Sequence, residues 1–450
     1  MARNLVTIDG NEAAAHIAYE FTDVAAIYPI TPSSPMAELT DKWSCKGRKN
    51  LFGQTVTITE MQSEAGAIAA VHGAAQTGSL AVSYTSSQGL MLMIPVLHRI
   101  AGERLPVVLH VAARTVGTHA MSIFGDHSDV MGCRNTGFAQ LCSGSVQEVV
   151  DLAGVAHLAA VKGHTPFMHF FDGFRTSHEI STVEMIDMQA LTGLLDRQEL
   201  DAFRHHALNP EHPKLRSSVQ NPDIFFQLRE GCNPYYDALP AIVEEYLESI
   251  NRITGRDYHL FNYYGAEDAT DVVIAMGSVS GTVREAVDYI NAHGGKAGFV
   301  QVHLYRPFSA EHLFKVLPGS VRNIAVLDRT KEPGSIGEPL FEDVCTAACK
   351  AGRQFRIIGG RYGLSSKDTD PGQILAVFAN LASAEPKTCF TIGIEDDVTM
   401  LSLKPLTYDN PGSDIYSCKF WGLGGDGTVG ANKNTVHIVS EQAGKYGQAY

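Results

Sequence analysis

Thr31 and Pro32 stand where a short apolar run gives way to a helix, and this junction has the form of a small anion site. The run covers residues 24–30, and threonine and proline are favoured at the N-cap and in the first helical turn. The N–H groups of Ser33 and Ser34, a hydroxyl and the positive end of the helix dipole would then face a ligand such as a carboxylate. An ordinary strand-to-helix turn has the same spacing, so the pattern alone leaves both interpretations open.

Two glutamates, Glu60 and Glu64, follow the next β-rich run, residues 55–59. Thr59 and Gln62 have the spacing of a capping box, which predicts a helix that starts at Thr59 and holds Glu64 one turn inside. One face of this helix carries only small residues: Gly66, Ala70 and Gly73. Such a face lets a backbone or a flat ligand approach closely, so we expect Glu64 to be partly buried. A solvated surface position is the usual alternative for a glutamate.

Arg114 ends an apolar run, residues 106–113, that we expect to be a central strand. A guanidinium at a strand end presents a planar fork of donors suited to bidentate recognition of a carboxylate, although a capping or surface arginine is commoner. Further on, residues 125–129 (GDHSD) offer histidine and aspartate side chains of the kind that bind metals. We favour a hydrogen-bonded turn for this loop and predict no metal site in the chain.

These residues gather at one edge if the chain folds as its pattern indicates. Helical and β-rich runs alternate in the first part of the chain, which predicts an α/β fold with a doubly wound parallel sheet covered by helices on both faces. The predicted strands are residues 24–30, 55–59, 80–85, 106–113 and 166–171. Ligands bind at the carboxyl ends of such strands. Thr31, Glu60 with Glu64, residues 86–89 and Arg114 each follow a strand, so four strand ends should meet at one crevice.

Two strings in this region resemble a known family. YPITPSSPMAE, residues 28–38, and TEMQSEAGA, residues 59–67, are similar to segments of the pyruvate:ferredoxin (flavodoxin) oxidoreductases, which oxidise 2-oxoacids with thiamin diphosphate. The resemblance implies that Thr31 and Arg114 hold the substrate carboxylate. It also implies that Glu64 hydrogen-bonds N1′ of the aminopyrimidine and drives the imino tautomer, whose nitrogen removes the C2 proton of the thiazolium. Glu60 is the rival for this role.

The resemblance also orders the rest of the chain. It implies a pyrimidine-binding thiamin-enzyme domain over residues 1–258 and a transketolase C-terminal-like α/β domain over residues 259–415. In the second region the predicted strands (272–276, 298–304, 323–327, 355–358) alternate with helices at 282–292 and 337–350. No catalytic set stands out there, although Arg306 and Arg329 near strand ends are candidate anion sites. Residues 205–222, rich in proline and polar side chains, are predicted to be a surface loop.

Residues 416–450 are expected to begin a third domain that is incomplete in this sequence. The string CKFWGLGGDGTVGANKN, residues 418–434, predicts a strand, a glycine-rich turn and a helix, which is the form of a phosphate-cradling loop. A glycine-rich loop alone is a weak signal. The resemblance associates this domain with coenzyme A and implies contacts to the coenzyme from Gly425, Asp426, Gly427, Thr428 and Asn432.

The composition is that of a globular enzyme of two to three domains, with 450 residues, 44% hydrophobic and 19% charged. A net charge of -14 argues against nucleic acid or an anionic membrane as a partner, and no apolar run is long enough to cross a membrane. The N-terminus lacks the apolar stretch of a signal peptide, so we predict a cytoplasmic location. The eight cysteines show no cluster or zinc spacing, and we expect them to be reduced and mostly buried.

The resemblance implies that the complete enzyme converts pyruvate and coenzyme A to acetyl-coenzyme A and carbon dioxide. Electrons would pass through 4Fe–4S clusters to ferredoxin or flavodoxin. The ligands of these clusters, and of the Mg²⁺ that accompanies thiamin diphosphate, would lie outside this chain. We expect the enzyme to be a homodimer. We also expect this chain to be inactive without the remaining domains of the enzyme. Two alternatives stay open: an oxidoreductase for another 2-oxoacid such as 2-oxoglutarate, and a non-catalytic fragment or assembly subunit.

Overall fold

The larger sheet of the protein is doubly wound and parallel, as the alternating pattern predicts. The computed structural model describes residues 4–216, 218–409, 415–443 and 445–449. Within these residues the larger sheet has seven strands in the order β12-β6-β7-β5-β4-β2-β3, and only β12 runs antiparallel to its neighbour. The strands are β2 (Val24–Ile27), β3 (Thr57–Glu60), β4 (Ala81–Thr85), β5 (Val108–Ala113), β6 (Ala139–Ser143), β7 (Phe167–Asp172) and β12 (Leu304–Arg306). Every residue of β4, β5, β6 and β7 is buried, as expected of strands covered on both faces.

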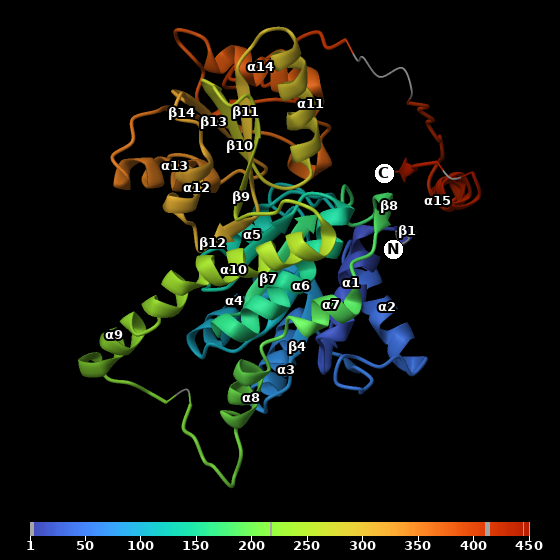
Figure 1. Ribbon diagram of the computed structural model, residues 1–450, viewed down its shortest axis with the longest axis vertical. Helices are drawn as coiled ribbons and strands as arrows, with labels where there is room; N and C mark the ends of the chain where they lie inside the picture. Colours follow the sequence, from blue (N-terminus) through green and yellow to red (C-terminus); the bar gives the residue numbers. More distant parts are fainter. Residues whose placement is uncertain (1–3, 217, 410–414, 444, 450) are drawn as a thin grey trace.

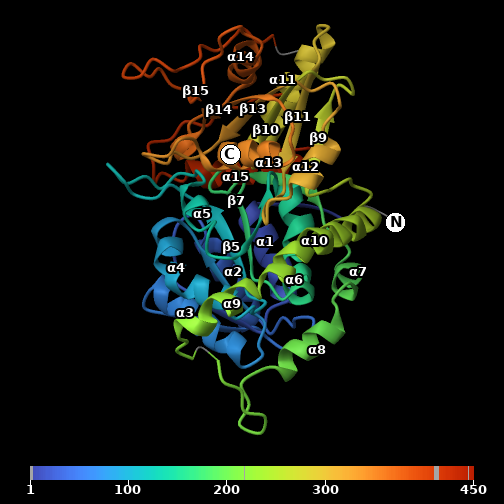
Figure 2. The same cartoon turned by 90° about the vertical axis from the view of Figure 1, so that its left-hand side faces the viewer.

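Helices cover both faces of this sheet (Figure 1). α3 and α4 lie on one face and α6 on the other, and Figure 2 shows these helices on opposite sides of the strands. The strand order reverses between the two connections, so right-handed crossovers, the general rule for parallel strands, would place the helices in this way. The helices of this part are α1 (Gly10–Glu20), α2 (Ser34–Cys45), α3 (Glu64–Gln76), α4 (Ser87–Gly102), α5 (Ser128–Gly132), α6 (Val146–Gly163), α7 (Met188–Gly193), α8 (Arg197–His205), α9 (Pro222–Glu230) and α10 (Asn233–Thr254). Among the described residues, no helix combines the length and the apolar character that a membrane span requires.

A second parallel α/β unit follows, as predicted. Its described strands form a sheet in the order β15-β14-β13-β10-β11-β9, in which only β9 is antiparallel. The strands are β9 (Phe261–Gly265), β10 (Asp271–Ala275), β11 (Ala297–Val302), β13 (Asn323–Asp328), β14 (Arg356–Arg361) and β15 (Phe390–Thr391). The helices are α11 (Val279–Ala292), α12 (Ala310–Val316), α13 (Pro339–Lys350) and α14 (Pro371–Leu381), with a short 3₁₀ turn η1 (Leu364–Ser366).

The carboxyl ends of strands in both sheets face each other across the contact between the two units. Asp172 ends β7 of the larger sheet, and its carboxylate accepts hydrogen bonds from the Ser278 N–H at 2.6 Å and from Arg329 Nη1 at 2.9 Å. Ser278 follows β10 and Arg329 follows β13 of the smaller sheet. The edge at which ligands bind in open α/β sheets is therefore shaped by both units.

The last described segment returns to the first unit. β1 (Leu5–Ile8) and β16 (Gln448–Ala449) both pair antiparallel with β8 (Ile180–Glu184), while α15 (Thr428–His437) and the π-helical turn η2 (Ile438–Gln442) precede β16. The strand predicted at the start of residues 418–434 is wrong. No ladder pairs with residues 418–421, and an isolated segment without a neighbouring strand has nothing to hold it extended.

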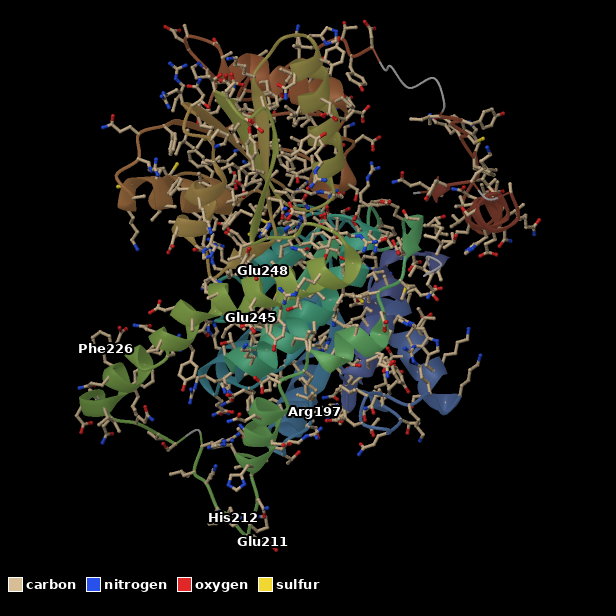
Figure 3. The ribbon with its side chains drawn as sticks, viewed as in Figure 1. Arg197, Glu211, His212, Phe226, Glu245 and Glu248 are labelled. Atoms are coloured by element: carbon tan, nitrogen blue, oxygen red, sulfur yellow. The ribbon has the colours of Figure 1, made fainter. Side chains whose placement is uncertain are left out.

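The predicted surface loop is confirmed, and it continues into a projecting helix. Apart from residue 217, residues 206–221 hold no helix or strand, and α9 has no buried residue. Figure 3 labels Phe226 on this helix, which extends away from the body of the protein.

The prediction that the cysteines are mostly buried is wrong. All eight are free, but only Cys133 and Cys142 are buried. Cys345 and Cys349, four residues apart on α13, are half-buried and exposed, so the helix face that they share is not a core face. Residue type alone favours burial, but Cys45, Cys345 and Cys349 lie on helices, where the amphipathic pattern of the helix decides exposure.

Candidate functional site

Arg114 and Thr31 meet at the carboxyl edge of the larger sheet, as their places after β5 and β2 predict. Arg114 Nη1 donates to the Thr31 carbonyl oxygen at 2.8 Å, and Nε donates to the Ser122 carbonyl oxygen at 3.3 Å. The arginine is only 7% exposed, whereas Thr31 lies at the surface. Within the described residues, Arg114 Nη2 and the Thr31 hydroxyl make no hydrogen bond, so both are available to a ligand carboxylate.

The helix after Thr31 starts later than predicted. Ser33 is the N-cap of α2, and the N–H groups of Ser33 and Ser34 donate to the Ile30 carbonyl oxygen at 2.9 and 3.0 Å. These two donors are therefore not free for an anion, and Thr31 is not the cap. A residue of α1 stabilises this turn, because Asn11 Nδ2 donates to the Pro32 carbonyl oxygen at 2.9 Å. A tertiary contact has overridden the local capping preference.

Glu64 is buried, as predicted, but it is the first residue of α3 rather than one turn inside it. The Ser63 hydroxyl caps this helix and accepts the Gly66 N–H at 3.2 Å. Thr59 instead pairs with Ala26 in the ladder between β3 and β2, which removes it from the predicted capping box. The start of a helix favours a negative side chain, so α3 stabilises the Glu64 carboxylate.

Glu64 lies against α4 with its carboxylate unpaired. It is 6% exposed, and it makes no hydrogen bond or ion pair within the part of the chain that the structure describes. A Cβ added to Gly89 would lie 2.6 Å from Glu64 Oε1 and 2.8 Å from Thr85 Oγ1. Thr85 Oγ1 is itself buried without a partner. Two unpaired polar groups, one at the end of β4 and one at the start of α3, therefore lie on either side of Gly89 and could bind a polar ligand.

Glu60, the rival of Glu64, has a different environment. It is the last residue of β3, the edge strand of the sheet, and its side chain is exposed. Gly66 and Ala70 are only half buried and Gly73 is exposed, so the small-residue face of α3 is accessible. The site residues that the sequence predicted follow β2, β3 and β5, with residues 86–89 after the intervening β4. Thus the predicted gathering of strand ends is confirmed.

Asp129 ties these strand ends together, and the sequence analysis missed this role. Its Oδ2 accepts the Ser87 N–H at 2.7 Å and the Arg114 N–H at 2.9 Å, and its Oδ1 accepts the Val130 N–H at 2.7 Å. Burial raises the pKa of Asp129 to about 7, against the pull of these hydrogen bonds. No sequence pattern marks the partners, because they come from two other strand ends.

The loop at residues 125–129 is a hydrogen-bonded turn, as favoured from the sequence. Asp126 Oδ1 accepts the Ser128 N–H at 2.9 Å, and His127 Nε2 lies 2.6 Å from Asp172 Oδ1. In the described residues, no three or more histidine, cysteine, aspartate or glutamate side chains are grouped so that they could hold a metal ion.

Arg306 and Arg329 are engaged by carboxylates rather than free for anions. Arg306 Nη2 lies 2.8 Å from Asp343 Oδ2, and Arg329 Nη1 lies 2.9 Å from Asp172 Oδ2. Arg329 is only 3% exposed. Neither arginine is therefore a candidate anion site.

The glycine-rich loop is partly filled by its own carboxylate. Asp426 accepts the Leu423 N–H at 2.8 Å and the Thr428 N–H at 3.0 Å, and these hydrogen bonds lower the pKa of Asp426 to about 2. Gly424, Gly425 and Gly427 have positive φ angles. A phosphate would have to replace Asp426 at two of the loop donors, so the loop as it stands is not an open phosphate cradle.

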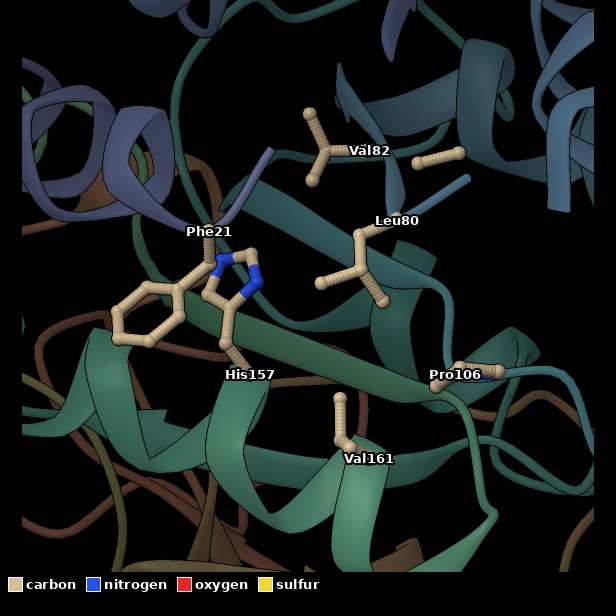
Figure 4. A pocket seen from close by; sticks show the side chains of 7 residues that line it. Phe21, Leu80, Val82, Pro106, His157 and Val161 are labelled. Carbon is tan, nitrogen blue, oxygen red and sulfur yellow. The ribbon is translucent and has the colours of Figure 1, made fainter. Parts of the chain in front are cut away.

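A buried pocket lies at the opposite edge of the sheet and is separate from this site. It is lined mainly by apolar side chains, and Figure 4 shows His157 stacked beside Phe21, with Leu80 and Pro106 nearby. Leu80 and Pro106 precede β4 and β5, so the pocket is at the amino ends of these strands. Such a place is not where parallel sheets bind substrates.

Family comparisons agree with this fold. A family model described as pyruvate flavodoxin/ferredoxin oxidoreductase, thiamine diphosphate-binding, matches residues 16–248, which is more than half of the chain. Together with the doubly wound sheet, this match defines the class, an α/β protein of the thiamin diphosphate-binding fold. A second model, described as pyruvate:ferredoxin oxidoreductase core domain II, matches residues 269–374. The chain belongs to the pyruvate flavodoxin/ferredoxin oxidoreductase family.

Proteins similar in sequence to this chain are named as oxidoreductases of this family. The chain is 56% identical over 453 residues to a pyruvate-flavodoxin oxidoreductase of Enterobacter agglomerans and 56% identical over 445 residues to a pyruvate:ferredoxin oxidoreductase of Moorella thermoacetica. It spans 38% of the length of each of these relatives. Among solved structures, a 2-oxoglutarate:ferredoxin oxidoreductase from Magnetococcus marinus, with 2-oxoglutarate, coenzyme A and succinyl-CoA bound, aligns over 83% of this chain and 64% of its own, with a TM-score of 0.62. At 17% identity this likeness shows the fold.

Proposed function

We propose that the chain supplies the pyrimidine-activating glutamate and the substrate-carboxylate clamp of a pyruvate:ferredoxin or pyruvate:flavodoxin oxidoreductase. The observation that carries this proposal is the burial of the unpaired Glu64 carboxylate on the same sheet edge as the Arg114–Thr31 pair. The curated relatives named for pyruvate, at 56% identity, support pyruvate over another 2-oxoacid.

The residues present fit the pyrimidine part of thiamin diphosphate. The cofactor, when bound, supplies the carbon nucleophile that attacks a 2-oxoacid. Glu64 would hold a proton at N1′ of the aminopyrimidine, because its side chain is largely buried and its carboxylate has no competing partner among the described residues. Gly89 leaves room for that carboxylate, and Thr85 Oγ1 offers one more hydrogen bond beside it.

Arg114 and Thr31 would bind and orient the substrate. The guanidinium is held by two carbonyl oxygens through Nη1 and Nε, which leaves Nη2 to donate to a carboxylate. The Thr31 hydroxyl adds a second donor from the end of β2, which β4 separates from β5 in the sheet. Two donors from two strands fix the orientation of the carboxylate and hence of the adjacent carbonyl carbon.

The remaining parts of the function stay predictions. They are the Mg²⁺ and 4Fe–4S ligands in other parts of the enzyme, coenzyme A contacts in the glycine-rich loop, the homodimer, the cytoplasmic location and the choice between ferredoxin and flavodoxin. For coenzyme A, Asp426 would have to release the amides of Leu423 and Thr428. The domain boundaries at residues 258 and 415 also stay predictions.

The test of the proposal is hydrogen–deuterium exchange at C2 of the thiazolium in the full-length holoenzyme. Glu64→Gln keeps the shape of the side chain but cannot trade a proton, so we expect exchange to slow by a factor of about 100 to 10,000. Glu60→Gln is the matched control, since Glu60 is an exposed glutamate four residues away, and it should leave the rate nearly unchanged. Wild-type exchange in Glu64→Gln, or a larger defect in Glu60→Gln, would refute the assignment.

A further inference from the structure

We propose that the second α/β unit positions the substrate clamp, through the hydroxyls of Ser365 and Ser366 in the turn that follows β14. This inference rests on the proposed function of Arg114, and it assigns a role to a unit in which the sequence offered no catalytic set. The two serines are positioning residues, because they act on the clamp through the segment that follows Arg114.

Arg114 begins a loop whose far end is held by the second unit. The Thr115 N–H donates to the Phe124 carbonyl oxygen at 3.1 Å, which closes the loop between these residues. Residues 117–121, 123 and 124 of this loop are exposed, so the body of the first unit does not hold them. The position of the Ser122 carbonyl that orients Arg114 Nε therefore depends on contacts at the closing end of the loop.

The second unit adds contacts at that end to those that the Thr115 hydroxyl makes with the Phe124 carbonyl oxygen and Asp126 Oδ2. Ser366 Oγ accepts the Gly125 N–H at 2.8 Å, and the Ser366 N–H donates to the Gly125 carbonyl oxygen at 2.8 Å. The hydroxyls of Ser365 and Ser122 lie 2.5 Å apart. The Ser365 N–H also reaches Asp126 Oδ2 at 3.4 Å. With the Ser366 hydroxyl, which also lies 3.5 Å from the Gly125 carbonyl oxygen, five contacts join this short turn to the segment that aims the guanidinium.

The backbone of this turn is shaped for the contact. Ser365 and Ser366 have φ angles of 53° and 55°, in the left-handed region that non-glycine residues rarely adopt. Glycine would adopt this conformation at lower cost, so stability alone does not favour serine here. What serine adds at both positions is a hydroxyl, and both hydroxyls point at the loop that carries the Ser122 carbonyl.

Through these contacts, the second unit would affect substrate binding although it contributes no residue to the clamp. A carboxylate is bound well only if the guanidinium plane is correctly oriented, since charge-assisted hydrogen bonds are directional. Loss of the serine hydroxyls would let residues 122–125 shift and would free Arg114 Nε from its carbonyl partner. Weakened binding of the substrate carboxylate is the expected effect, with little change in the chemical step once substrate is bound.

The experiment uses the full-length holoenzyme with Ser365→Gly and Ser366→Gly, separately and together. Glycine removes the hydroxyl but keeps the left-handed backbone, so the variants should fold with an unchanged Tm. We expect the pyruvate KM to rise by about 5- to 20-fold in the double variant, while kcat changes by less than about twofold. The KM for coenzyme A should not change. The preference for pyruvate over methyl pyruvate, which lacks the carboxylate charge, should fall by the same factor as the KM rises.

Ser383→Gly is the matched control. Ser383 is an exposed serine of the same unit whose hydroxyl makes no hydrogen bond among the described residues, and its removal should leave all these values unchanged. Unchanged pyruvate KM in the serine variants, with a large defect in Arg114→Ala, would overturn the inference and leave the proposed function standing. Normal pyruvate kinetics in Arg114→Ala would overturn the proposed clamp, and the inference with it. A uniform loss of kcat with a lowered Tm would show a merely structural role and would also overturn the inference.

Discussion

Glu64 depends on the absence of a side chain at Gly89. An added Cβ would lie 2.6 Å from Glu64 Oε1 and 2.7 Å from its Cγ, closer than real contacts allow, so Gly89→Ala must displace the carboxylate. We expect kcat/KM for pyruvate to fall by about 100-fold, the cost of misplacing a reacting group by an ångström. Steady-state kinetics of the holoenzyme would measure this. Gly102→Ala, in the same helix with no atom within 4 Å of the new Cβ, should retain full activity. Equal activity in the two variants would contradict the close contact.

Arg114 makes the charged half of the clamp and Thr31 the neutral half. Arg114→Ala should lower kcat/KM for pyruvate by an amount equivalent to about 2 to 4 kcal/mol, because a charge-assisted partner of the carboxylate is lost. Thr31→Val should act in the same direction but less, since its carbonyl oxygen, which holds Arg114 Nη1, is retained. The pyruvate kinetics of the two variants test this order. A larger defect in Thr31→Val would mean that the carboxylate lies nearer the hydroxyl than the guanidinium.

The placement of the site side chains could be predicted from the sequence better than the local geometry around them. The burial of Glu64 and the meeting of Thr31 with Arg114 follow from strand ends, and the structure confirms both. The cap of α3 was misplaced because Thr59 and Ser63 are both good capping residues. Only the ladder with β2, which takes up Thr59, decides between them, and a local pattern does not contain that contact.

At the scale of elements, three histidines join two strands and a helix inside the larger sheet. His110 on β5 lies 3.0 Å from His169 on β7 through their Nδ1 atoms and 3.0 Å from His157 on α6 through their Nε2 atoms. Burial lowers the pKa of His110 to about 3 and holds the pKa values of His157 and His169 well below the usual range. All three are therefore neutral in the folded protein at pH values where the unfolded chain binds protons.

This cluster predicts a loss of stability in acid. The stabilising effect is complete above the unfolded histidine pKa of 6.5, and it is lost as pH falls from there towards the folded values. Each histidine contributes up to about 1.4 kcal/mol per pH unit in that window. Asp129 and Asp328, whose pKa values burial raises to about 7, act in the opposite direction, so a single pH profile would mix the two effects.

A comparison with His157→Phe separates them. Phenylalanine keeps the stacking on Phe21, and both proteins contain the same acidic groups. Denaturant unfolding between pH 7.5 and 5 should show that the variant loses less stability on acidification, by about 1.4 kcal/mol per pH unit below pH 6.5. Parallel profiles for the two proteins would mean that His157 is already charged in the fold.

The order of elements was largely predictable, while their long-range joining was not. The strands β2, β3, β4, β5 and β7 of the larger sheet, and β10, β11, β13 and β14 of the second, were predictable from alternating patterns, because strand and helix periods are local properties. β12 is the counterexample. In the sequence, β12 stands between β11 and α12 of the second unit. In the structure, it pairs antiparallel with β6 of the larger sheet. A three-residue strand has no periodicity, and its partner is more than 150 residues away, so nothing local marks it.

At the scale of the whole molecule, a buried carboxylate is one of the contacts that join the two units, beside the pairing of β12 with β6. Asp172 is 0% exposed and meets His127, Ser278 and Arg329, of which the last two belong to the second unit. Burial alone would raise the pKa of Asp172, but the charges of Arg329 and His127 hold it well below the usual range. Its stabilising effect is therefore present above the ordinary pKa of 3.8 and is lost only as pH falls below it.

Removal of this carboxylate should weaken the whole protein rather than one surface. Asp172→Ala leaves the Arg329 guanidinium buried, at 3% exposure, without its counter-charge, and such a change costs about 3 to 5 kcal/mol. Glu245→Ala is the matched control, since it removes a carboxylate from the exposed pair with Lys162, and it should cost less than about 1 kcal/mol.

Because Ser278 and Arg329 follow strands of the smaller sheet, we also expect Asp172→Ala to unfold in two steps, as the units separate first. The double variant with Asp172→Asn and Arg329→Met buries no lone charge and should recover part of the lost stability. Calorimetry of the four proteins decides the matter: a single transition at the wild-type Tm in Asp172→Ala would show that the units are held by other contacts.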